Sequence, residues 1–259
     1  MKVLNKNIGV LDLNIDNIYF LNALREKFIN DNIHYINDMS ITNVDEMTND
    51  DINKSINNAI NYLLTKNIDV LIVVSDSIVE FCEEQINNLS IPVINIVNET
   101  IKYVNENYEH KNIGFLSTTS MIEANIYQKN FEYNHLYNMH GDELKLLIRN
   151  QLVKTTETFQ EVKNVIATIY KKDVDVLVPS LINYLTVYTE INEFIKDLDI
   201  LPVDNILCDA TQNLLYKEES LPEKGKGKTF IYYKQQFDNN MLNRLLKIKY
   251  NLVEIEKNA

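Results

Sequence analysis

Two serines occupy the positions where this sequence is best placed to do chemistry. Ser75 follows a run of β-branched residues in the segment VVSDS (73–77), and Ser180 follows a second run in the segment VPSLIN (178–183). Each run is typical of a buried parallel strand, and each leads directly into a helical pattern. Open α/β sheets bind their ligands at the carboxyl ends of such strands. We therefore expect a pocket at these two strand ends.

The hydroxyl groups of these serines need a neighbouring base to act in proton transfer. A serine hydroxyl is a weak acid and reacts only when an adjacent group takes its proton. All four histidines lie outside the two serine segments: His34, His110, His135 and His140. We therefore expect Ser75 and Ser180 to be almost inert as an acid/base pair. Ser180 follows Pro179, which favours a structural role in a turn or helix cap.

Further polar residues near the ends of predicted strands are candidates for ligand binding: Asp12, Asp76, Ser77, Thr118 and Asn183. Several of them also have a structural explanation. Ser77 stands three residues before Glu80, which favours a helix capping box. Asp12 could equally cap a helix that starts near Asp16, and Asp76 could equally bind backbone groups of its loop.

Strand and helix patterns alternate along the chain. The predicted strands are short and rich in Val and Ile, at 8–11, 34–36, 70–74, 93–97, 113–117, 174–178, 206–208 and 230–233. The predicted helices span 16–29, 50–64, 77–89, 120–131, 142–170, 182–195 and 238–251. This alternation predicts an α/β fold with mainly parallel sheets and helices on both faces. The segment 217–228, which contains EKGKGK, is predicted to be a flexible loop.

Two pairs of segments look like copies of one another. Residues 8–24 and 113–131 both run from a strand through a polar turn into an amphipathic helix. Residues 69–81 and 175–187 share the order Asp-Val-Leu, apolar run, Ser, helix. This duplication indicates two similar lobes that face one another across a cleft at the carboxyl ends of their strands.

The composition of the chain argues against nucleic-acid binding and membrane association. The chain has 259 residues, of which 45% are hydrophobic and 24% are charged, as in ordinary globular proteins. A net charge of −12 repels nucleic-acid phosphates and anionic lipids, so we expect neither direct nucleic-acid binding nor membrane binding. No run approaches the roughly 20 apolar residues of a membrane span, and no signal peptide is recognisable. We therefore expect a cytoplasmic protein.

The two cysteines, Cys82 and Cys208, have no metal-type spacing and form no disulfide framework. Cys82 stands beside Phe81 in a helical pattern, which predicts that it packs in the core. Cys208 is predicted to end a strand. Because the histidines are also scattered, we expect no metal site and no cofactor.

Six motifs follow one another in a recognisable order: IGVLD (8–12), the segment 69–77, IPVI (91–94), KNIGFLST (111–118), YQ (127–128) and the segment 175–180. This order resembles that of glutamate racemases in the aspartate/glutamate racemase superfamily, and the resemblance spans nearly the whole chain. It implies two flavodoxin-like lobes related by a pseudo-twofold axis. One lobe would comprise residues 1–97 with 204–259, and the other residues 98–203.

Racemases of this family remove a proton from one face of an amino acid and return one to the other, which requires two opposed acid/base groups. The resemblance implies that these groups are cysteine thiols, in Cys-Asn-Thr and Cys-Thr-His triplets. At the matching positions this chain has SDS (75–77) and SLI (180–182), so serine replaces both thiols. Asn183 would stand in shifted register for the histidine.

Substrate contacts differ from the family pattern as well. The family's Asp-Ser at the end of the first strand corresponds to Asp12-Leu13, and its Pro-Tyr-Gly segment falls near residues 43–45. Asp76 adds a carboxylate to a site that holds dicarboxylic amino acids in the family, and like charges repel. We therefore expect glutamate to be a poor ligand.

Three hypotheses about function follow. The first is a glutamate racemase-like pseudoenzyme that binds a small polar or amino-acid-like ligand in the cleft. The second is an active, cofactor-independent glutamate or aspartate racemase that uses other groups. The third is a regulatory role through a protein partner, because an acidic surface suits a basic protein. The resemblance also raises the expectation of a homodimer, since members of the family often dimerise.

Overall fold

The computed structural model describes residues 5–13, 15–37, 48–217, 225–234 and 239–255. The chain forms two compact units, one from residues 1–96 and 207–259 and the other from residues 97–206. Each unit contains its own parallel sheet flanked by helices, so the predicted α/β fold is confirmed. Among the described residues, no helix is both long enough and apolar enough to cross a membrane.

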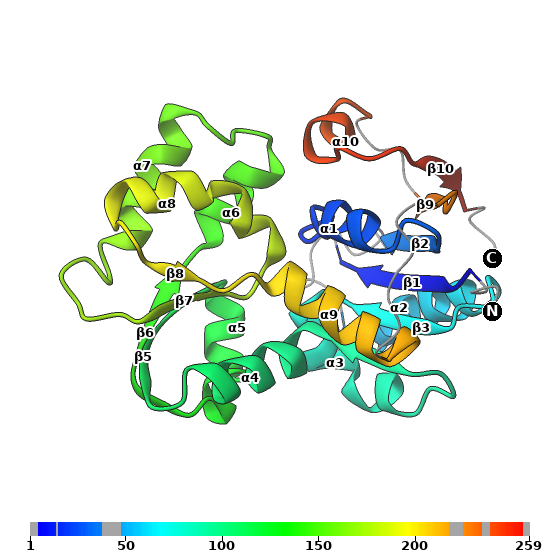
Figure 1. Cartoon of the computed structure of the whole chain (residues 1–259), viewed down its shortest axis with the longest axis horizontal. Coiled ribbons are helices and arrows are strands. Elements are labelled where there is room, and N and C mark those ends of the chain that lie inside the picture. The colour runs from blue at the N-terminus through cyan, green and yellow to red at the C-terminus, as the bar shows by residue number, and fades with distance from the viewer. Residues whose placement is uncertain (1–4, 14, 38–47, 218–224, 235–238, 256–259) are drawn as a thin grey trace. The chain divides into compact units, whose positions relative to one another are not determined.

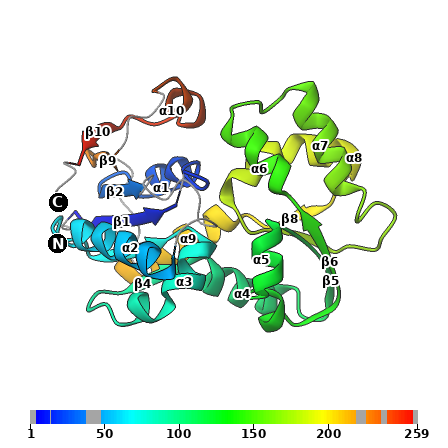
Figure 2. The same cartoon turned by 180° about the vertical axis from the view of Figure 1, so that it is seen from behind.

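The first unit contains a six-stranded sheet in the order β10-β9-β2-β1-β3-β4, in which all neighbours are parallel (β4 is labelled in Figure 2 and the other strands in Figure 1). Its strands are β1 (Asn7–Asp12), β2 (Asn32–Asn37), β3 (Val70–Val73), β4 (Val93–Asn95), β9 (Thr229–Tyr233) and β10 (Asn251–Glu254). Its helices include α1 (Phe20–Lys27), α2 (Asn49–Leu64), α3 (Asp76–Asn87) and α10 (Asn239–Leu245). The apolar strand β3 is buried along its whole length, as expected for a parallel strand covered on both faces.

The second unit contains a four-stranded parallel sheet in the order β6-β5-β7-β8. Its strands are β5 (Lys111–Ser117), β6 (Tyr133–His140), β7 (Val176–Pro179) and β8 (Asp199–Ile200). Its helical segments include α5 (Thr119–Ala124), η2 (Gln128–Asn130), α6 (Asp142–Arg149), α7 (Thr156–Ile166), η3 (Ile182–Val187) and α8 (Tyr188–Phe194). Helices α7 and α8 lie side by side in both Figure 1 and Figure 2. Their apolar faces pack with those of β5 and β7 in one core.

Two helices carry the chain across the boundaries between the units: α4 (Ile96–Asn107) and α9 (Val203–Tyr216). The predicted strand at 206–208 is wrong, because these residues lie inside α9. Val203, Ile206, Leu207 and Thr211 are all buried, and their spacing follows one face of a helix. A short apolar run does not by itself distinguish a strand from a helix.

Several predicted boundaries also differ from the structure. The predicted helix 142–170 is interrupted, and α7 begins after Thr155, whose side chain accepts a hydrogen bond from the Thr158 amide. The predicted helix 238–251 is shorter, since α10 is followed by the strand β10. Strand β6 was not predicted, because most of its side chains are polar and exposed. Of the predicted loop 217–228, residues 218–224 lie outside the described ranges.

Candidate functional site

Asp12 lies at the carboxyl end of β1, at the same edge of the sheet as the ends of β2 and β3. Its carboxylate is fully buried and accepts hydrogen bonds from four donors. These are the amides of Leu13 (2.8 Å) and Asn17 (3.0 Å), the Asn17 side chain (3.1 Å) and the Tyr35 hydroxyl (2.7 Å). Asp12 therefore holds the turn that precedes α1, in the manner of a cap.

Burial raises the pKa of Asp12 to about 6. The hydrogen bonds from Tyr35 and Asn17 favour the ionised form and lower this pKa, whereas the nearby Asp16 raises it, and the effect of burial dominates. Asp12 is thus a carboxyl group that can exchange a proton near neutral pH, the property required of a general acid or base.

Asn37 is the register partner of Asp12 on β2. It is fully buried, and neither its Oδ1 nor its Nδ2 has a hydrogen-bond partner among the residues that the structure describes. A buried amide without partners costs free energy, so such a group is normally satisfied by water or a ligand. The sequence analysis did not single out Asn37, although it directly follows the predicted strand 34–36.

Ser75 and Asp76 stand at the junction between β3 and α3. Ser75 is buried and occupies the N-cap position of α3, but its side chain makes no capping hydrogen bond. Asp76 accepts hydrogen bonds at Oδ1 from the Ser77 amide (2.8 Å) and hydroxyl (3.5 Å). The predicted capping role of Ser77 is wrong, because α3 begins at Asp76 and already includes Ser77.

Glu80 follows on the same helix as Asp76. Its carboxylate oxygen Oε2 is buried without a hydrogen-bond partner in the described part of the chain. Burial and the negative charge of Asp76 both raise the pKa of Glu80. The carboxyl groups of Asp76 and Glu80 are therefore close enough for the charge of Asp76 to disfavour ionisation of Glu80.

In the second unit, the hydroxyl of Ser117 donates a hydrogen bond to Ser180 Oγ at 2.8 Å. Ser117 ends β5 and Ser180 follows β7, and both side chains are fully buried. The Ser180 amide also donates to the carbonyl of Leu116 at 2.9 Å, which continues the pairing of the two strands. Ser180 is thus held in the sheet, and Leu181 occupies the N-cap position of the η3 helix.

Thr118 directly follows Ser117, Asn183 stands three residues after Ser180, and both are buried. The Thr118 hydroxyl lies 3.2 Å from the hydroxyl of Ser120, in the first turn of α5. Asn183 belongs to the η3 helix, where its carbonyl accepts a hydrogen bond from Thr186. The structure therefore brings Thr118 and Asn183 to the same sheet edge as Ser117 and Ser180.

His140 was placed outside the candidate motifs by the sequence, but the structure brings it to the same edge of the second sheet. It is the register partner of Ser117, and its Nδ1 lies 2.9 Å from the Thr119 hydroxyl. That hydroxyl donates to Asp142 Oδ2 at 2.7 Å. Within the described ranges, no imidazole forms a hydrogen bond with Ser75 or Ser180. The other three histidines contact Tyr232, Glu109 and Asn112.

The two thiols both belong to helices of the first unit. Cys82 lies in α3, is buried, and donates a hydrogen bond to Asn53 Oδ1 at 2.9 Å, and burial raises its pKa to about 11. Cys208 lies buried inside α9, so the prediction that it ends a strand is wrong. The described residues contain no group of three His, Cys, Asp or Glu side chains placed to hold a metal ion. The segment 43–45, which the resemblance matched to a substrate-binding motif, lies outside the described residues.

No family model matches this chain. It is 18% identical over 251 residues to the glutamate racemase of Hydrogenobaculum sp. strain Y04AAS1, with 95% of each chain covered. Among solved structures, glutamate racemase isoform RacE1 from Bacillus anthracis superimposes with a TM-score of 0.83 and 17% identity, covering 97% of this chain and 98% of the other. Glutamate racemase from Francisella tularensis, solved with D-glutamate, also gives 0.83, with 16% identity and the same coverage.

The chain has the fold of the glutamate racemases. The sequence relatives and the structural neighbours together support the aspartate/glutamate racemase family. Ser75 lies between β3 and α3 of the first unit, and Ser180 lies between β7 and η3 of the second unit. That they replace the two thiols of the racemases stays a prediction from the positions of the motifs.

Proposed function

We propose that this protein is a racemase-like pseudoenzyme that binds a small polar, amino-acid-like ligand and does not racemise it. The observation that carries this proposal is the hydrogen bond that Ser117 donates to Ser180. The hydroxyl of Ser180 is fully buried and is already engaged by this bond. Neither Ser180 nor Ser75 has an imidazole within hydrogen-bond distance among the described residues. A serine hydroxyl without such a base does not take the α-proton of an amino acid.

Ligand binding is supported by the polar groups that remain at the edge of the first sheet. Asn37 keeps both polar side-chain atoms buried without a partner in the described chain. Asp76 adds a carboxylate directly after Ser75, at the start of α3. These groups suit a ligand with an ammonium group and hydrogen-bonding atoms, and they disfavour a dicarboxylate such as the D-glutamate bound by the Francisella tularensis racemase.

An active racemase with different groups is the second candidate, and two observations favour it. The pKa of Asp12 is raised to about 6, which suits proton transfer near neutral pH. His140 lies at the edge of the second sheet as the register partner of Ser117.

Proton exchange in heavy water distinguishes the two candidates. The purified protein is incubated with L-glutamate, D-glutamate or L-aspartate in deuterium oxide, and the α-proton signal is followed by NMR. We expect no loss of this signal beyond that without protein. A Ser75→Cys, Ser180→Cys variant tests whether thiols restore exchange. Loss of the α-proton signal with the unmodified protein would establish the second candidate instead.

Binding is tested separately by thermal shift with a panel of amino acids. We expect at least one neutral or basic amino acid to raise the melting temperature, and glutamate and aspartate to have little effect. Asp76→Asn should strengthen dicarboxylate binding about tenfold, because a like charge within about 4 Å costs on the order of 1 to 4 kcal/mol. Glu84→Gln, the same charge change at an exposed position of α3, is the control. If no amino acid raises the melting temperature of the unmodified protein or of the Asp76→Asn variant, the binding proposal is wrong.

A further inference from the structure

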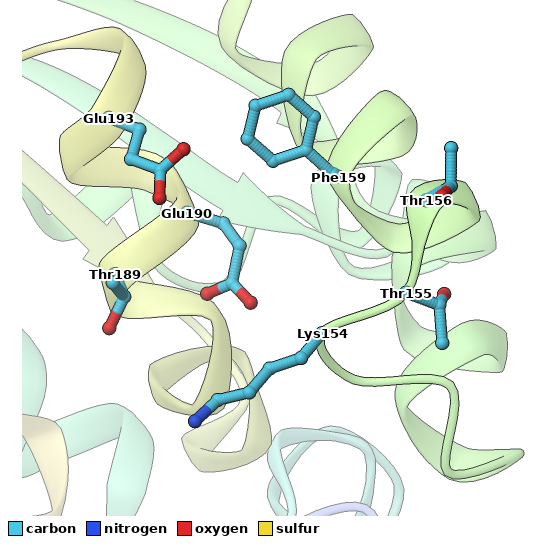
Figure 3. Close-up of a pocket in the computed structure, with 7 residues that line it drawn as sticks. All are labelled: Lys154, Thr155, Thr156, Phe159, Thr189, Glu190 and Glu193. Carbon is cyan, nitrogen blue, oxygen red and sulfur yellow. The ribbon is translucent and has the colours of Figure 1, made fainter.

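A pocket of about 520 Å³ lies between α7 and α8 of the second unit (Figure 3). Four lining residues come from the start of α7 and the residues before it, and three from α8: Lys154, Thr155, Thr156, Phe159, Thr189, Glu190 and Glu193. None of these residues belongs to the strand ends described above. The pocket is therefore a separate site within one unit.

Glu190 is a buried carboxylate in the wall of this pocket. Only 7% of the residue is exposed, and its Oε2 has no hydrogen-bond partner among the described residues. Figure 3 shows the carboxylate directed from α8 into the space toward Lys154 and Thr155. A buried carboxylate is costly unless a cation or hydrogen-bond donor pairs with it. The pocket therefore presents an unsatisfied acceptor to any ligand that enters.

The charges around the pocket favour a positively charged ligand. Glu193 lies three residues after Glu190 on α8, and residues at this spacing are neighbours on one face of a helix. Lys154 is the only cation among the seven lining residues. Within the part of the chain that the structure describes, Lys154 forms no ion pair with Glu190. The lining thus carries two negative charges and one positive charge.

The opposite wall supplies an apolar surface. Phe159 is 38% exposed and packs against Phe194 with ring centroids 4.8 Å apart, which fixes the ring at the side of the pocket. Thr156 and Thr189 are exposed and add hydroxyl groups at the rim. A ligand that fits both walls has a cationic end and a short hydrocarbon chain, because cations and alkyl groups both pack favourably on an aromatic ring.

We propose that this pocket binds a small alkylammonium cation, with an ammonium group on Glu190 and the hydrocarbon chain against Phe159. A second ammonium group at the far end of such a chain would reach Glu193. Binding at this site does not depend on whether the protein racemises amino acids, so this proposal is tested independently of the proposed function.

Isothermal titration calorimetry of the full chain with 1,4-diaminobutane tests this proposal. We expect saturable binding at one site, weakened by added salt because the interaction is between charges. Two molecules of the same chain length are controls: 1,4-butanediol lacks charge and succinate carries the opposite charge, and neither should bind. Absence of saturable heat with the diamine, or equal binding of the diol, would overturn the proposal.

The variant Glu190→Gln tests the role of the buried carboxylate. It keeps the shape of the side chain but removes its charge, and we expect diamine binding to weaken about tenfold or more. Glu143→Gln, an exposed position of α6, makes the same change of net charge and should bind the diamine as the unmodified protein does.

The melting temperature without ligand provides a second readout. Removal of an unpaired buried charge should leave the melting temperature unchanged or raise it. If Glu190→Gln instead lowers the melting temperature and binds the diamine as well as the unmodified protein does, then Glu190 is paired within the protein. In that case the proposed site is wrong.

Discussion

Asp12 is a buried carboxyl group whose pKa is raised to about 6, and this predicts how the stability of the protein depends on pH. Because the folded state favours the protonated form, the stabilisation from protonation is complete below the unfolded pKa of 3.8. It is lost as pH rises through about 6. The loss should reach roughly 3 kcal/mol, since one pKa unit corresponds to about 1.4 kcal/mol.

The variant Asp12→Asn removes this titration. Thermal unfolding followed by circular dichroism between pH 4 and pH 7 should show the unmodified protein losing stability relative to the variant up to pH 6. The difference should level off above pH 6. Glu84→Gln, an exposed carboxylate on α3, is the matched control and should follow the unmodified protein. Parallel curves for Asp12→Asn and the unmodified protein would contradict the raised pKa.

Candidate residues could be located from the sequence, whereas their surroundings could not. Ser75, Asp12 and Ser180 were recognised because they end apolar runs, and the structure places each at a strand end. The buried contact between Ser117 and Ser180 depends on the pairing of β5 with β7. The pairing of two strands that lie about 60 residues apart cannot be recognised from the sequence of either strand alone.

At the scale of elements, the start of α6 packs closely on the η3 helix. A Cβ atom added to Gly141 would lie 2.6 Å from the Tyr184 hydroxyl oxygen and 2.9 Å from Leu116 Cδ1. Tyr184 in turn donates a hydrogen bond to the Gly141 carbonyl at 3.0 Å. Gly141→Ala should therefore lower the free energy of unfolding by about 1–3 kcal/mol through overpacking.

A double-mutant cycle with Tyr184→Phe checks this explanation. Loss of the hydroxyl oxygen removes the atom closest to the added methyl group, so Gly141→Ala should cost less when it is combined with Tyr184→Phe. Urea unfolding of the four proteins gives the coupling, which we expect to be at least about 0.5 kcal/mol. Additive effects would mean that the methyl group is accommodated without moving Tyr184.

Most elements with an apolar pattern were predicted correctly, although the run 206–208 was predicted as a strand and lies in α9. The runs that form β1, β3, β5 and β7 were all recognised as strands. Strand β6 was not predicted, because it lies at the edge of its sheet and exposes polar side chains on most of its length. The same omission hid His140, the last residue of that strand.

At the scale of the whole molecule, both cysteines belong to the first unit, so thiol reactivity reports on that unit alone. Both thiols are buried, and the pKa of Cys82 is raised to about 11. At pH 8 its thiolate population is therefore more than about a hundredfold below that of an unperturbed cysteine. We expect a disulfide reagent to label the native protein slowly and the urea-unfolded protein rapidly.

The variant Ser120→Cys provides the comparison, because this residue is exposed in the second unit. Its added thiol should react at once in the native protein, while Cys82 and Cys208 stay unreactive. Mass spectrometry of the labelled protein identifies the site. Rapid labelling of Cys82 in the native state would show that the first unit opens readily, contrary to the close packing of its helices.

The sequence by itself determined the class of fold, because the alternation of β-branched runs with helical periods depends on local chemistry alone. It also located the strand ends that carry Asp12, Ser75 and Ser180. Only the tertiary structure decided which polar groups are satisfied and which are not. The buried amide of Asn37, the Ser117–Ser180 contact and the buried carboxylate of Glu190 all depend on burial by elements distant in sequence.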